Sequence, residues 1–178
     1  MKQSSKCAIG GIVSALSLVL MISVAIIPFL TYALPALAGV LIIFIVIEID
    51  KKWAFGVYSA VGILAFLLVH DKEVAMMYIA FFGYYPIIKA LLESKMPVAL
   101  GWIIKVLLFN VTMVAAYVVL IYLMGITVDE IAEYGGKVAV PMLLGAGTVA
   151  FVAYDIALTR IISLYMVKWR KYFKRYFK

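Results

Sequence analysis

Long apolar runs, interrupted by short charged or turn-forming segments, follow one another along the whole chain. A run of about 20 apolar residues crosses the hydrocarbon core of a bilayer as an α-helix. The pattern predicts six such helices, at residues 7–28, 31–48, 53–69, 74–92, 98–124 and 138–167. We therefore expect an all-α integral membrane protein, with a six-helix transmembrane domain at residues 1–167 and a tail at residues 168–178.

The first two predicted helices are separated only by Pro28, Phe29 and Leu30, so a single kinked element is the alternative. At about 1.5 Å rise per residue, one helix of that length would far exceed a hydrocarbon core of about 30 Å. We favour two helices, with the break near Pro28 or Pro35. A cleaved signal peptide is disfavoured because the first apolar stretch is longer than the roughly 7 to 15 residues of a signal core.

The composition supports the membrane assignment and excludes other classes. The chain has 178 residues, of which 67% are hydrophobic and 14% are charged, against about 45–50% and 25% in soluble domains. Both a water-soluble globule and a disordered chain are excluded. Cys7 and His70 are single residues of their types, so the sequence predicts neither an intramolecular disulfide nor a Cys/His metal site.

The charges are distributed unequally between the two sides of the predicted bundle. One side holds twelve of the sixteen Lys and Arg residues, at positions 2, 6, 51, 52, 89, 95, 168, 170, 171, 174, 175 and 178. The other side holds only Lys72 and Lys137, beside five acidic residues. Because cytoplasmic segments are enriched in Lys and Arg, we expect both termini in the cytoplasm. The net charge of +7 is then a sign of orientation and gives no reason to expect a nucleic-acid partner.

The predicted tail is amphipathic. Its aromatic residues, starting at Trp169, recur at intervals of three and four, and Lys and Arg occupy the positions between them. On a helix this pattern gives one aromatic and one cationic face, typical of a segment in the headgroup layer. The tail either anchors the last helix or docks onto a partner.

Small residues form a stripe at the start of the first predicted helix. Ala8, Gly11 and Ala15 lie on one helical face near the cytoplasmic end. Small side chains let helices approach closely in lipid. The stripe serves either packing within the bundle or contact with another subunit.

Five charged residues fall within the predicted spans, all in their inner halves: Glu48, Lys89, Lys105, Asp155 and Arg160, of which Lys105, Asp155 and Arg160 are the candidate site residues. Ionisable groups are expensive inside a membrane and mark functional or paired sites. Lys105 and Asp155 have opposite charges at compatible depth, which favours a buried ion pair. Coupling to a cytoplasmic partner and an ion or proton pathway are the alternatives, although the outer half offers no acids or histidines within the spans to continue a relay.

The outer half carries tyrosines instead, at Tyr32, Tyr78, Tyr117, Tyr122 and Tyr134. They form either an ordinary interfacial belt or the wall of a pocket that takes a flat organic solute. The segment 125–137 is the longest predicted loop, has glycines near both ends, and is a candidate lid over such a pocket.

Motifs of known enzymes and of self-sufficient transporters are missing. The sequence contains no Gly-x-Ser-x-Gly, H-E-x-x-H, P-loop or G-x-G-x-x-G motif, so we do not expect an enzyme or a cofactor. It also shows no inverted repeat of the kind from which alternating-access transporters are built. A chain of this size is expected to oligomerise or to work as a subunit.

The chain resembles the S components, the membrane-embedded substrate-binding subunits of energy-coupling factor (ECF) transporters. The resemblance rests on the six short-looped spans, the stripe Ala8-x-x-Gly11-x-x-x-Ala15, the run from Pro28 through Leu34-Pro35-Ala36-Leu37-Ala38-Gly39, and the charged turn Asp50-Lys51-Lys52-Trp53-Ala54-Phe55-Gly56. Gly11 departs from the alanine pair usual in the family.

The resemblance implies a binder for a vitamin-like micronutrient, with the small organic solute held near the outer face. Such a subunit joins a transmembrane coupling subunit and two cytoplasmic ATPases, and the docking contact would fall on Ala8, Gly11 and Ala15. The rival hypothesis is a small structural or assembly protein of the cell-envelope scaffold type, which acts through helix packing and its basic tail. A channel-like oligomer or a lipid-handling protein is a third.

Overall fold

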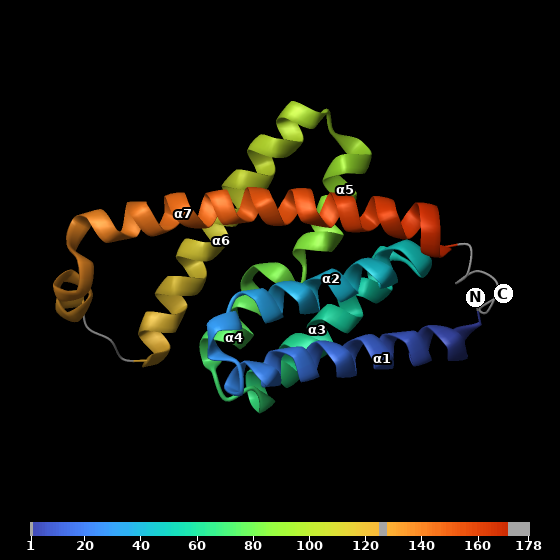
Figure 1. Ribbon diagram of the computed structural model, residues 1–178, viewed down its shortest axis with the longest axis horizontal. Helices are drawn as coiled ribbons and strands as arrows, with labels where there is room; N and C mark the ends of the chain where they lie inside the picture. The colour runs from blue at the N-terminus through green and yellow to red at the C-terminus, as the bar shows by residue number, and fades with distance from the viewer. Residues whose placement is uncertain (1, 125–127, 171–178) are drawn as a thin grey trace.

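The protein is a bundle of helices in a computed structural model (Figure 1). The structure describes residues 2–124 and 128–170 and, within them, all side chains except those of residues 120, 123, 124, 128–141, 143 and 169. All regular elements in these residues are helical: α1 (Gln3–Ile22), α2 (Ala33–Glu48), α3 (Lys51–Leu68), α4 (Lys72–Met77), α5 (Tyr85–Lys95), α6 (Val98–Met124) and α7 (Val128–Leu164). Short 3-10 turns follow α1 at Ser23–Ala25 and Pro28–Leu30, and π-helical turns follow α4 and α7 at Tyr78–Phe82 and Tyr165–Trp169.

Five helical segments of the described chain are long and apolar enough to cross a membrane: Gln3–Ala25, Lys51–Leu68, Lys72–Lys95, Val98–Val119 and Leu144–Lys168. Each corresponds to one of the helices predicted from the sequence. The sixth predicted helix is α2, which is apolar but has only 16 residues. The all-helical class is therefore confirmed, and five of the six predicted spans are helices with the length and apolar composition that a membrane crossing needs.

The break between the first two helices lies at Pro28. This residue opens the second 3-10 turn, where its missing N–H leaves no backbone partner unsatisfied. Pro35, the other predicted position, lies inside the first turn of α2, where proline is tolerated for the same reason. The chain thus turns sharply after α1 and returns as a separate helix.

The next span contains a π-helical turn between α4 and α5. Its widened ring is closed by the Gly83 N–H, which donates to the Tyr78 carbonyl at 2.8 Å. The Tyr58 hydroxyl on α3 donates to the Ile79 carbonyl in this turn at 2.7 Å. Gly39 on α2 lies directly against the turn, since a Cβ atom there would collide with the Phe82 carbonyl group. Glycine at this position lets α2 and the π-turn touch backbone to backbone.

Helices α1, α2 and α3 pack side by side through aliphatic side chains (Figure 1). Gly10 brings α1 close to α3, because a Cβ atom there would lie 3.2 Å from the Val57 side chain. The Ser17 hydroxyl donates to the Ala38 carbonyl of α2 across 3.5 Å. This half of the bundle is held by the close contacts of small and aliphatic residues that membrane helices commonly use.

Helix α7 lies across α5 and α6, and α6 crosses it obliquely (Figure 1). An aromatic cluster joins these helices, with the Phe109 and Phe151 rings stacked at 4.9 Å between centroids. Helix α7 already begins at Val128, so residues 128–137 are helical and the predicted loop at 125–137 is wrong for that part. A spacing of three to four among Val128, Ile131 and Ala132 suits a helix, and the helix continues through Gly135 and Gly136.

Large apolar side chains cover much of the outside of the bundle. Ile26, Phe29 and Leu67 are each at least 70% exposed, and many other Ile, Leu and Val residues on α1, α3 and α6 are also exposed. Soluble monomeric proteins rarely expose apolar patches of this extent, which are typical of surfaces in contact with a membrane or another protein. The surface therefore faces the hydrocarbon of a lipid bilayer.

Candidate functional site

The most strongly charged part of the interior is a junction of three helices. Lys89 and Glu93 come from α5, Lys105 from α6 and Asp155 from α7. We call these four residues the charged junction. Lys89, Lys105 and Asp155 are all at least 97% buried, whereas the Glu93 side chain is about half exposed.

The four side chains of the charged junction form a closed ring of alternating charge. Lys89 Nζ lies 2.6 Å from Asp155 Oδ1 and 2.7 Å from Glu93 Oε1. Lys105 Nζ lies 2.7 Å from the same Glu93 oxygen and 3.3 Å from Asp155 Oδ1. The Tyr85 hydroxyl also donates to Asp155 Oδ1, and the Lys105 ammonium lies 5.2 Å from the centre of the Trp102 ring.

Two ammonium groups and two carboxylates make this ring neutral as a whole. Each charge has two partners of opposite sign, which is the condition under which buried ionic groups are tolerated. The ring also ties α5, α6 and α7 together at one depth. Since all four groups lie in one layer, the arrangement suits a structural lock better than the relay that proton transfer across a membrane needs.

The structure answers the question that the sequence left open for Lys105 and Asp155, because the two side chains are in contact. Arg160, the third predicted charge, lies exposed on α7 outside the junction. The site also contains Lys89, Glu93 and Tyr85, which were not among the candidate site residues. Their spacing was the available signal, since residues 85, 89 and 93 repeat every four positions on one face of α5.

The predicted docking residues lie on the outside of the bundle. Ala8, Gly11 and Ala15 are all exposed on one face of α1. A Cβ atom at Gly11 would meet nothing within 4 Å, in contrast to the neighbouring Gly10, which faces Val57. The two adjacent glycines therefore differ in their surroundings: Gly10 packs inside the bundle, and Gly11 lies on its outside with open space beside it.

The predicted tyrosine pocket is not gathered in one place. Tyr32, Tyr117 and Tyr122 are exposed, with Tyr122 at 87%, whereas Tyr78 is fully buried. No hydrogen bond or ring contact joins these four tyrosines to one another in the described part of the chain. The side chain of Tyr134, the fifth predicted residue, lies outside the described residues, as do residues 171–178 of the predicted tail.

Tyr78 lies among other aromatic side chains at the π-helical turn. Its ring is 6.0 Å from that of Tyr58, and Gly83 leaves room for both rings. The hydroxyls of Tyr78 and Tyr84 are buried, and neither finds a hydrogen-bond partner among the described residues. Buried polar groups are nearly always paired, so the Tyr78 hydroxyl is a candidate for contact with a bound polar group, whereas Thr112 lies within reach of Tyr84.

Tyr32 has a specific partner at the end of the bundle where α1 gives way to α2. Its hydroxyl donates to the Glu73 carboxylate at 2.8 Å. This hydrogen bond to a carboxylate, together with partial burial, raises the pKa of Tyr32 to about 12. The contact ties the α1–α2 turn to the start of α4.

At the opposite end, Glu48 on α2 accepts from the Tyr165 hydroxyl at 3.2 Å and lies 3.4 Å from Arg170 Nε. The end of α7 is therefore fixed beside the end of α2, at the same side of the bundle as the start of α1 (Figure 1). Among the described residues, no three His, Cys, Asp or Glu side chains gather in a way that would hold a metal ion.

The fold and these sites define a multi-pass α-helical membrane protein with a buried charged junction and an exposed face of small residues. No protein-family model, curated protein or solved structure matches the chain. The functional assignment therefore rests on the residues and their geometry.

Proposed function

We propose that the protein is the substrate-binding membrane subunit of a micronutrient uptake transporter of the ECF type. In this proposal it lies in the cell membrane with both termini in the cytoplasm. It captures a small organic solute from the outer face and docks onto a transmembrane coupling subunit and two cytoplasmic ATPases. Helix α2 also crosses the membrane and brings the number of spans from five to six.

The observation that carries the proposal is the exposed face of α1. The three residues that the family resemblance assigns to the coupling contact are all among those that the bundle leaves uncovered. Gly11 has nothing within 4 Å of its Cβ position, so packing inside the subunit gives no reason for a glycine there. A small residue at this position is useful if a second helix approaches α1 closely, because helix contacts in lipid depend on such approaches.

Support for the six-span topology comes from the ends of the chain. The start of α1 and the end of α7 lie at the same side of the bundle (Figure 1), which agrees with an even number of spans. Helix α2 is the most enclosed of the short elements, with Leu34, Ala38 and Ile42 buried. Its 16 residues rise about 24 Å at 1.5 Å each, and the 3-10 turn before it extends the apolar segment. The excess of Lys and Arg at this side supports a cytoplasmic location.

Support for solute capture comes from the unpaired hydroxyl of Tyr78. A polar solute group that reached it would supply the missing hydrogen bond. Because Tyr78 is fully buried, truncation to alanine would open a cavity and destabilise the bundle by about 3–5 kcal/mol. Tyr78→Phe removes the hydroxyl alone and is therefore the informative substitution.

The proposal is tested by mass spectrometry of small molecules released from the purified protein, followed by a binding titration with the solute that is found. We expect Gly11→Leu to bind this solute as wild type does but to abolish uptake in cells. Tyr78→Phe should weaken binding about fivefold, the change expected for one neutral hydrogen bond, without changing thermal stability.

The matched control for Gly11→Leu is Gly56→Leu on α3, where a Cβ atom also meets nothing within 4 Å. It should leave both binding and uptake unchanged. A protein that releases no solute, and whose Gly11→Leu variant supports uptake normally, would contradict the proposal.

The second candidate is a structural or assembly protein. It is favoured by the scattered positions of Tyr32, Tyr117 and Tyr122, which the described structure does not bring into one pocket. In that case α1 would dock onto a scaffold partner, Gly11→Leu would disturb cell shape or assembly, and no solute would be released from the purified protein.

A further inference from the structure

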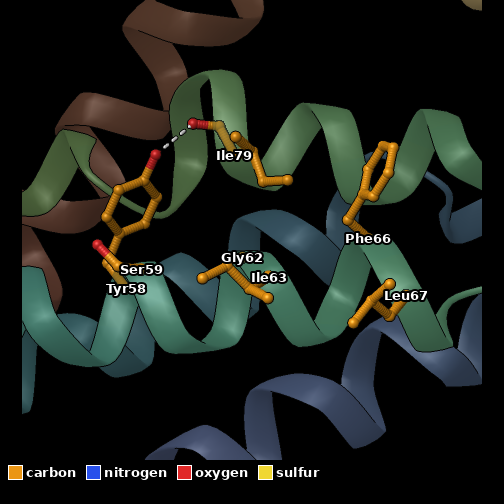
Figure 2. Close-up of a pocket in the computed structure, with 7 residues that line it drawn as sticks. All are labelled: Tyr58, Ser59, Gly62, Ile63, Phe66, Leu67 and Ile79. Atoms are coloured by element: carbon orange, nitrogen blue, oxygen red, sulfur yellow. Dashed lines mark hydrogen bonds between the residues drawn. The ribbon is translucent and has the colours of Figure 1, made fainter.

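A groove runs along the outside of α3 in the half of the bundle near the C-terminal end of that helix (Figure 2). Its volume is about 400 Å³, which is in the range of ligand-binding pockets. The lining comes from one face of α3, at Tyr58, Ser59, Gly62, Ile63, Phe66 and Leu67, together with Ile79 from the π-helical turn.

The groove exists because two features coincide. Gly62 has no side chain, and a Cβ atom there would lie 3.3 Å from the Ile79 side chain, so the floor is formed by this close approach. The π-helical turn exposes the Ile79 carbonyl, and Tyr58 reaches across to bind it (Figure 2). Phe66 and Leu67 border the other end of the groove (Figure 2).

The polar groups of the groove are already satisfied within the protein. The Tyr58 hydroxyl donates to Ile79, and the Ser59 hydroxyl donates to the Phe55 carbonyl of its own helix at 3.0 Å. A ligand in the groove therefore finds a mostly apolar floor with no free hydrogen-bond donor. Such a floor suits an alkyl chain better than a polar solute.

A cation lies at the Phe66 end of the groove. The Lys72 ammonium is 5.5 Å from the centre of the Phe66 ring and donates to the Phe66 and Val69 carbonyls at 2.8 and 3.1 Å. An ammonium group has three N–H donors, so one remains for a ligand. The neighbouring carboxylates form no ion pair with Lys72 in the described structure: one oxygen of Asp71 accepts from the Glu73 N–H, and one oxygen of Glu73 accepts from Tyr32.

An apolar channel with a cation at its end is complementary to a phospholipid. We propose that this groove is a specific phospholipid site, with one acyl chain along Gly62 and the phosphate on Lys72. Asp71 and Glu73 beside the cation favour a zwitterionic headgroup, whose ammonium they attract, over an anionic one. The site lies on α3, apart from both the charged junction and the α1 face, and does not depend on the proposed transport function.

The test is native mass spectrometry of the full chain in detergent, with synthetic phosphatidylethanolamine as the probe and the matching diacylglycerol as the phosphate-free comparison. We expect wild type to retain one phosphatidylethanolamine and to retain diacylglycerol poorly. Lys72→Gln should lower phosphatidylethanolamine retention about fivefold, as expected when one cation near a phosphate is lost, and should not affect diacylglycerol.

Two substitutions change the groove itself. Ser59→Leu fills it, and Leu67→Gln makes its border polar at a position that is 70% exposed, so at least the second variant should fold as wild type does. Both should abolish lipid retention. The matched control is Ala60→Leu, which is exposed on α3 but does not line the groove, and it should retain the lipid.

Three results would overturn the proposal. Equal retention by Leu67→Gln and Ala60→Leu would show that no acyl chain lies in the groove. Equal retention by Lys72→Gln and wild type would show that the phosphate does not bind Lys72. A change in self-association of the groove variants, with lipid retention unaltered, would assign the groove to a second copy of the chain.

Discussion

The α1–α2–α3 half and the α5–α6–α7 half of the bundle are held together by different kinds of contact. In the first half, Gly10 and small or aliphatic side chains bring the helices close without any interhelical ion pair among the described residues. In the second half, the charged junction binds three helices through Lys89, Glu93, Lys105 and Asp155. The difference shows that the helices of one bundle are positioned in two ways, by complementary shape in one half and by paired charges in the other.

These two kinds of contact differ in how they respond to change. Where helices pack closely through small residues, an added side chain separates them and destabilises the bundle. The hydrophobic effect does not compensate in lipid, because the surrounding hydrocarbon is as apolar as the helices. A charge network loses stability when one member is removed, because its partners remain buried and unpaired. Sensitivity to substitution should therefore lie at glycines in the first half and at ionic groups in the second.

The largest effect is expected at Asp155 in the charged junction. Asp155→Asn leaves Lys89 and Lys105 buried with Glu93 as their single carboxylate, so the free energy of unfolding should fall by about 3–5 kcal/mol. The measurement is unfolding in mixed micelles, followed by helical circular dichroism. Arg160→Gln on the same helix is the control, because Arg160 is exposed and its loss should change stability by less than about 0.5 kcal/mol.

A double substitution sharpens this prediction. Lys105→Met combined with Asp155→Leu removes one cation and one anion and leaves the pair Lys89 and Glu93, which is neutral. The double variant should be more stable than Asp155→Asn, because replacing a buried pair by apolar groups is often neutral. If it is as unstable as the single variant, charge balance does not explain the junction.

A smaller effect is expected at Gly39, where the two halves touch. Gly39→Ala places a methyl group against the Phe82 carbonyl, so α2 and the π-helical turn must separate, which costs about 1–3 kcal/mol for an overpacked site. Gly56→Ala is the matched control, because its Cβ position is empty. Equal thermal stabilities of the two variants would show that the close approach at Gly39 does not contribute.

The smallest effect is expected at the hydrogen bond between Tyr32 and Glu73. Glu73→Gln removes the carboxylate that raises the pKa of Tyr32 to about 12, so this pKa should fall toward its ordinary value of 10.0. Because the folded pKa is raised, the stabilisation by this contact is complete below pH 10 and is lost as the pH rises toward 12. NMR titration of labelled tyrosine, with Tyr32→Phe for assignment, measures the change, and an unaltered pKa would contradict it.

The sequence predicted the helices better than the site. Apolar run length alone was sufficient for the spans at Lys51–Leu68 and Val98–Val119, because a bilayer imposes both helix and length. The opposite charges of Lys105 and Asp155 also indicated their contact. Lys89 was counted with the cytoplasmic residues, since the positive-inside rule counts charges at the ends of spans and does not say which of them turn inward.

The tyrosines show why the other residues of the candidate site could not be predicted from the sequence. Tyr78 and Tyr122 have the same residue type and comparable predicted depth, yet one is fully buried and the other is 87% exposed. Which of them faces the interior depends on the rotation of each helix. Helix α6 has apolar residues on all its faces, so hydrophobic periodicity could not fix its rotation.

The central claim, that α1 presents a docking face, is tested most directly by cross-linking from Cys7 in native membranes. Cys7 is the single cysteine of the chain, it is exposed, and it precedes Gly11 by one helical turn. With a benzophenone attached to Cys7, we expect wild type and Gly56→Leu to cross-link to a second multi-pass membrane protein that co-purifies with ATPase subunits, and Gly11→Leu to lose this product while remaining folded. The same cross-link at the same yield in Gly11→Leu, or cross-links to lipid alone, would contradict the account.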